Sequence, residues 1–108
     1  MGRQILLITG ILLFFTGCAN HCFRLKGDTL HMYLKRPDAK TVYFSCSLDG
    51  YELHRATRVD AKTWEARVPA NGEFTYFYIV DGAVYVPPCR LKEYDDFGGE
   101  NCIYIPDL

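Results

Sequence analysis

The sequence predicts an all-β fold, an immunoglobulin-like β-sandwich of about seven strands, behind an N-terminal signal peptide. Short runs of alternating apolar and polar residues follow one another from Thr29 onward, and no stripe with the 3.6-residue period of a helix interrupts them. Turn-forming residues separate these runs at intervals of about 8 to 12 residues, which is the spacing typical of a β-sandwich.

The N-terminus predicts export. Arg3 precedes an apolar run from Ile5 to Phe15, which is well short of the roughly 20 residues of a membrane-spanning helix. Two small residues stand directly before Cys18, as lipoprotein signal peptidase requires. We therefore expect residues 1–17 to be a lipoprotein signal peptide and Cys18 to become the lipidated first residue of the mature chain.

The residue after Cys18 predicts the membrane in which the lipoprotein is anchored. Ala19 follows the cysteine in place of the aspartate that retains lipoproteins in the inner membrane, so we expect a lipid-anchored protein of the cell envelope, at the outer membrane. Acyl chains contribute about 0.8 kcal/mol of membrane affinity per buried methylene. Residues 18–27 are then the lipidated N-terminus and a linker, and residues 28–108 the folded domain. The alternative is an uncleaved anchor, because Phe15 replaces the usual leucine of the lipobox.

Turn residues define the expected strands. Pro37 and Asp38 end the first strand, and Asp81-Gly82 fits a two-residue type I′ hairpin turn, in which both central residues take a positive φ. Pro87-Pro88 removes amide donors and ends the strand before it. The expected strands cover residues 29–35, 41–46, 53–59, 63–68, 73–80, 83–86 and 101–105, and residues 90–100 are expected to form a surface loop.

Four cysteines remain after Cys18, and they predict disulfides. In an exported protein an even number of cysteines favours pairing, and four cysteines allow three pairings. We favour Cys89 with Cys102, which flank the last turn, and Cys22 with Cys46. A zinc site is disfavoured because no two cysteines form a C-x-x-C pair.

Charge and composition exclude several kinds of function. No basic stripe is present, so we expect no nucleic-acid partner. Ser45 and Ser47 lie in an expected strand without a nucleophile-elbow pattern, so we expect no enzyme and no cofactor. We also expect no metal: a calcium ion at Asp95 and Asp96 is the alternative to a solvated acidic pair. The histidines, which are scattered along the chain, are expected at the surface: His21, His31 and His54.

The order of motifs resembles one family. The run from Leu30 to Tyr51 is similar to the start of the N-terminal β-sandwich of isoamylases and glycogen-branching enzymes. The run from Gly72 to Gly82 resembles a strand and hairpin of the glycogen-binding domain in β subunits of AMP-activated protein kinase, and Gly98 to Ile105 resembles its last loop and strand. The resemblance implies an early-set immunoglobulin-like sandwich that binds α-glucans.

The resemblance also implies ligand contacts. The family stacks sugar rings on two tryptophans and hydrogen-bonds the hydroxyls with a lysine and an asparagine. By this resemblance Tyr51 aligns with the first tryptophan and keeps an aromatic face, whereas Val84 aligns with the second tryptophan and has no aromatic ring. Phe77 aligns with the lysine, and Asn101 aligns with the asparagine. Phe97 aligns with a leucine that, in the family, inserts into the helix of the bound glucan.

Three functions stay open at this point. The first is a membrane-anchored, non-catalytic module that binds an α-glucan or another glycan through Tyr51, Phe77, Phe97 and Asn101. The second is a protein-interaction module that has lost sugar binding and docks to an envelope protein through the region of Phe77 and Tyr85. The third is a structural envelope lipoprotein without a small ligand. In the last two, Tyr51 is an ordinary half-exposed aromatic residue.

Overall fold

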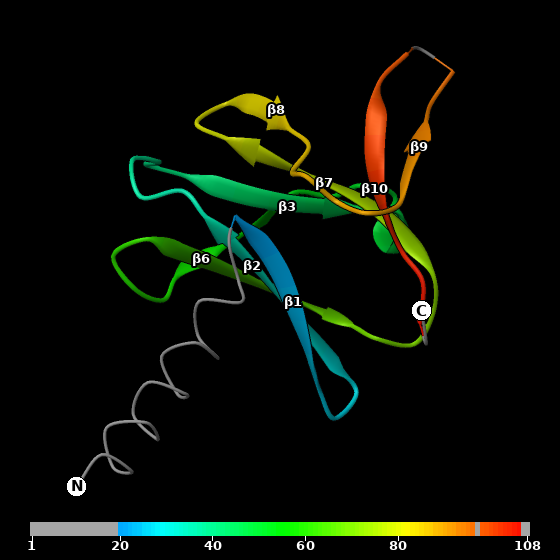
Figure 1. Ribbon diagram of the computed structural model, residues 1–108, viewed down its shortest axis with the longest axis horizontal. Helices are drawn as coiled ribbons and strands as arrows, with labels where there is room; N and C mark the ends of the chain where they lie inside the picture. Colours follow the sequence, from blue (N-terminus) through cyan, green and yellow to red (C-terminus); the bar gives the residue numbers. More distant parts are fainter. Residues whose placement is uncertain (1–19, 97, 107–108) are drawn as a thin grey trace, which may run out of the picture.

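The computed structural model describes residues 20–96 and 98–106. Over these residues the chain forms two antiparallel β-sheets packed face to face, which confirms the expected all-β sandwich (Figure 1). One 3-10 turn, η1 (Ser47–Asp49), is the helical element of this described part, and it contains no helix long and apolar enough to cross a membrane. The predicted signal peptide, Cys18 and Phe97 lie outside the described residues.

The first sheet, sheet A, has four strands in the order β1-β2-β6-β5. At its centre, β2 (Thr29–Lys35) pairs along its whole length with β6 (Thr63–Pro69). The strand β1 (His21–Lys26) continues the sheet beside β2, and β5 (Thr57–Arg58) continues it beside β6.

The second sheet, sheet B, is built around β7 (Phe74–Val80). β3 pairs with one edge of β7 along its length, whereas β10 and β8 share the other edge. The remaining strands of this sheet are β3 (Val42–Cys46), β4 (His54–Arg55), β8 (Ala83–Tyr85), β9 (Lys92–Tyr94) and β10 (Glu100–Tyr104).

Strict alternation places the core between the sheets. Along β7 the even-numbered residues 74–80 are buried, and the odd-numbered residues between them are half-buried on the opposite face. From sheet A, Leu30, Met32 and Leu34 face them and are fully buried. Trp64 also lies in this core, and its indole N–H donates to the Arg36 carbonyl at 3.0 Å.

Residues 21–26, expected as linker, form β1. A two-residue turn with Gly27 at a φ of 63° returns the chain into β2, and Lys26 lies opposite Thr29. The rings of Phe23 and Tyr104, which belong to different sheets, form a T-shaped contact with 5.3 Å between their centroids. The folded domain therefore includes residues that precede the expected boundary at residue 28.

Residues 53–59 form two short strands, where the alternation predicts one. β4 pairs with β3 in sheet B, and β5 pairs with β6 in sheet A. Ala56 lies between them, is buried, and donates its N–H to the Val42 carbonyl at 2.8 Å. The chain therefore crosses from one sheet to the other at Ala56.

The two hairpins near the C-terminus show one confirmed and one missed turn. Asp81 and Gly82 have φ values of 49° and 84°, as the predicted type I′ turn requires. Part of the expected loop 90–100 is the strand β9, which pairs with β10. The Asp95 carboxylate accepts the Gly99 N–H at 2.8 Å and so helps to close this hairpin.

Candidate functional site

The outward face of sheet B brings together three residues of the predicted ligand site. Phe77 lies between two core residues of β7 and therefore points outward. On β3, Ser45 lies opposite Phe77. On β10, Cys102 lies opposite Tyr76, so the neighbouring Asn101 faces the same way as Phe77. Tyr51 reaches this face from the loop after η1.

Tyr51 is fixed over Phe77 by both its ring and its backbone. The two rings are stacked, with 5.8 Å between centroids and 22° between planes. The Tyr51 hydroxyl hydrogen-bonds the Thr75 hydroxyl at 2.5 Å. The Tyr51 N–H donates to the Cys46 carbonyl at 2.9 Å, and the Ser45 hydroxyl donates to the Tyr51 carbonyl at 2.9 Å. The orientation of the ring is therefore set by the protein alone.

The backbone of Tyr51 is in an uncommon conformation. Its φ is 68°, in the left-handed region that residues with a side chain seldom adopt. Such a conformation persists where the surrounding structure determines it, and it is concentrated at functional sites. The side chain is 38% exposed, so the ring stays accessible to solvent beside Phe77.

A second row of outward side chains extends this surface. Tyr43 of β3 lies opposite Ile79 of β7, and Ile79 lies opposite Val84 of β8. Val84 is 67% exposed, which is high for an apolar side chain next to other apolar groups. We call the five residues of both rows the outer patch: Tyr43, Tyr51, Phe77, Ile79 and Val84.

The other predicted contacts fit less well. Asn101 is only 8% exposed, so little of its amide can reach a ligand. Phe97 lies outside the described residues. Tyr85 lies opposite Tyr78, which points into the core, and the Arg36 guanidinium lies 4.7 Å from the centre of the Tyr85 ring. A docking surface that combines Phe77 with Tyr85 is therefore wrong, because the two side chains lie on opposite faces of the sheet.

A polar cluster in the segment from η1 to β4 was missed by the sequence analysis. The ligand atoms of Asp49, Glu52 and His54 lie within 4.8 Å of one another, and all three residues are exposed. The His54 ring contacts the Asp49 carboxylate, and this hydrogen bond is the main reason that the pKa of Asp49 lies below its usual value. The chain's return from η1 into β4 brings the three together, which no spacing rule for metal ligands indicated.

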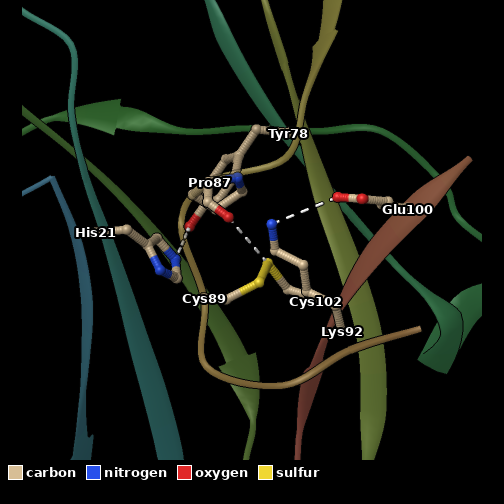
Figure 2. Close-up of a disulfide and its surroundings, with 7 residues drawn as sticks. All are labelled: His21, Tyr78, Pro87, Cys89, Lys92, Glu100 and Cys102. Atoms are coloured by element: carbon tan, nitrogen blue, oxygen red, sulfur yellow. Dashed lines mark hydrogen bonds and ion pairs between the residues drawn. A yellow bond between two sulfur atoms is a disulfide. The ribbon is translucent and has the colours of Figure 1, made fainter. Parts of the chain in front are cut away.

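Of the three histidines expected at the surface, His31 is buried and His21 is half-buried. Nε2 of His21 lies 3.0 Å from the Tyr78 hydroxyl (Figure 2), and burial lowers the pKa of His21 to about 4. His31 is 8% exposed, and its Nδ1 lies 3.2 Å from a carboxylate oxygen of Glu65. The expectation of a surface histidine is therefore wrong for His31, whereas His21 is partly exposed and His54 is exposed.

Of the two favoured disulfides, one is confirmed and one is wrong. Cys89 and Cys102 are joined, with 5.9 Å between their Cα atoms, and tie the segment after Pro87 to β10 (Figure 2). Cys46 is a free thiol buried in the core, and burial raises its pKa. Cys22 alternates with the core-facing residues of β1, so it faces outward from sheet A and cannot meet Cys46.

Comparison with known proteins finds that the chain matches no protein-family model and no curated sequence. The resemblance to glycogen-binding domains therefore stays a prediction that rests on the residues quoted for it.

Proposed function

We propose that this chain is a membrane-tethered, non-catalytic module of the cell envelope that binds an α-glucan, or a glycan of similar shape, on the outer patch of sheet B. The observation that carries the proposal is the Tyr51–Phe77 stack, which is exposed and held in one orientation. Sugar rings present apolar C–H faces, and a tyrosine offers a flat apolar surface together with a hydroxyl.

The proposed contacts divide into stacking and hydrogen bonding. A pyranose ring stacks on the exposed part of Tyr51, and Phe77 supports that ring from below. The hydroxyls of Tyr51 and Thr75, which lie 2.5 Å apart, can bond sugar hydroxyls. Because Tyr51 is already ordered by Thr75, binding costs little side-chain entropy.

The experiment is electrophoresis in gels with and without glycogen or amylopectin. We expect the protein to be retarded by the glucan and Tyr51→Ala to lose the retardation. Tyr94→Ala is the matched control, because Tyr94 is 72% exposed on β9, away from the outer patch, and should leave retardation unchanged. Circular dichroism checks that each variant is folded. Equal migration of the parent protein in both gels would contradict glucan binding.

The exposure of Val84 favours a second function, a protein-interaction module. Tyr43, Ile79 and Val84 form a row whose one polar side-chain group is the Tyr43 hydroxyl, and such a mostly apolar row suits a protein surface better than a sugar. A photo-crosslinker placed at Val84 should then capture one defined envelope protein in intact cells. The same probe placed at Tyr94 should not capture it. Retardation by glucan without such a crosslink would favour the first function.

A further inference from the structure

We propose that β1, the free edge of sheet A, docks against an anionic lipid surface. The inference rests on the membrane tether in the proposed function, and it adds an orientation of the domain on the bilayer. It concerns a part of the molecule that the glycan site does not use.

The first observation is that β1 exposes apolar side chains. Within the described residues β1 pairs with β2 alone, so its other edge is unpaired. Phe23 is 49% and Leu25 59% exposed, although both lie on the face of β1 that is directed toward sheet B. In Figure 1 the turn between β1 and β2 projects beyond the rest of the sandwich in this view. Sheet B therefore does not cover the end of β1.

The second observation is positive charge on the other face of the same strand. Arg24 and Lys26 alternate with Phe23 and Leu25. A groove of about 530 Å³ runs beside this face, and its walls include Arg24, Lys35 and Lys62 against the single acid Asp60. Apolar side chains flanked by basic ones are the composition that binds at the interface of anionic membranes.

The position of β1 in the chain selects the membrane as the occupant. The strand begins at His21, three residues after Cys18. An extended chain covers at most about 3.5 Å per residue, so the start of β1 lies within about 10 Å of a lipidated Cys18. An uncleaved apolar segment would hold β1 near the bilayer in the same way.

A second copy of the chain fits this edge less well. An antiparallel partner β1 would bring another Arg24 and Lys26 to the same sheet, and like charges on neighbouring strands destabilise the pairing. Lipid phosphates complement these charges instead. Docking through β1 also leaves the outward face of sheet B, with Tyr51, accessible to a large glycan.

The test uses the mature lipidated chain, incorporated into vesicles of phosphatidylglycerol and phosphatidylcholine with brominated acyl chains, which quench nearby tryptophans. Phe23→Trp is the probe, and Tyr94→Trp, on the exposed strand β9, is the matched control. The parent protein supplies the background of the buried Trp64. We expect strong quenching of Phe23→Trp and none beyond the background for Tyr94→Trp.

Charge is tested with Arg24→Gln combined with Lys26→Gln in the Phe23→Trp protein. The ratio of docked to undocked protein should fall about fivefold for each basic side chain removed, the equivalent of about 1 kcal/mol each. Vesicles of phosphatidylcholine alone should have a similar effect. Quenching that is equal in both kinds of vesicle would overturn the anionic-lipid requirement.

The outcomes separate docking from the proposed function. A chain that floats with the vesicles but shows no quenching of Phe23→Trp overturns docking and leaves the tether intact. A chain that does not float with vesicles overturns both the tether and the docking. Glycan binding is measured independently by retardation in glucan gels, so its failure does not affect either result.

Discussion

The ring of Tyr51 lies on the ring of Phe77 at a distance of 5.8 Å between centroids, with 22° between their planes. Tyr51 follows a 3-10 turn, whereas Phe77 lies in the middle of the central strand of sheet B. A hydrogen bond to Thr75 and a left-handed backbone hold Tyr51 in this position. The sandwich thus presents an aromatic surface whose geometry is set before a ligand arrives.

Tyr51→Phe separates the ring from its hydroxyl. The variant keeps the stack on Phe77 and loses the hydrogen bond to Thr75. Since such a bond is worth about 1 kcal/mol, we expect affinity for the glucan to weaken about fivefold at most. Thr75→Val removes the same bond from the other side and should give the same change. A complete loss of retardation in Tyr51→Phe would show that the ring is not the main contact.

His21 makes the stability of the fold depend on pH. Its pKa falls from 6.5 to about 4 because burial disfavours the charged ring. Between these values the unfolded state binds more protons, so stability is complete above pH 6.5 and is lost as the pH falls toward about 4. At about 1.4 kcal/mol per pKa unit, the loss is on the order of 3 kcal/mol.

The melting temperature across this pH range checks the assignment. His21→Gln keeps a polar partner for the Tyr78 hydroxyl and cannot titrate, so its melting temperature should change less between neutral and acidic pH than that of the parent. An identical pH profile for His21→Gln and the parent would contradict the role of His21.

The disulfide between Cys89 and Cys102 stabilises the edge at β9 and β10. Its partners are separated by 13 positions in the sequence, and a loop of this length corresponds to about 3 kcal/mol in the chain-entropy account. We expect the double variant Cys89→Ala, Cys102→Ala to lose stability of this order in urea unfolding. An unchanged unfolding midpoint would show that packing around Cys102 alone holds the edge.

Cys46 should be chemically silent in the folded protein. The thiol is 3% exposed and burial raises its pKa, so little of the reactive thiolate is present or accessible. Iodoacetamide is expected to label Cys46 only after unfolding in urea, with the site located by mass spectrometry. Cys46→Ala supplies the control for label at this position. Rapid labelling of Cys46 under native conditions would contradict its burial.

The local pattern of the sequence determined the main strands and some of their links. Alternation with a period of two identified the residues that became β2, β3, β6 and β7, because one face of each is buried. The Asp81-Gly82 turn followed from its need for positive φ, and the pairing of Cys89 with Cys102 from their positions beside the last turn.

Two strands at sheet edges could not be found in the same way. β9 is exposed throughout and is held by its pairing with β10 and by the hairpin that Asp95 closes. β1 does alternate, but its apolar residues Phe23 and Leu25 stay exposed, and it lies within the segment expected to be a linker. An edge strand is stabilised by pairing with one neighbouring strand, so its own residues predict a strand only weakly.

The candidate site was partly predicted and partly decided by tertiary structure. The resemblance pointed to Tyr51 and Phe77, but the sequence alone did not predict that their rings stack. It also did not predict that Tyr85 lies on the opposite face or that His54 contacts Asp49. The alternation of apolar and polar residues predicts only that neighbouring residues of a strand face opposite sides of its sheet. Which sheet a strand joins, and which of its faces another sheet then covers, is decided by pairing between segments far apart in the chain.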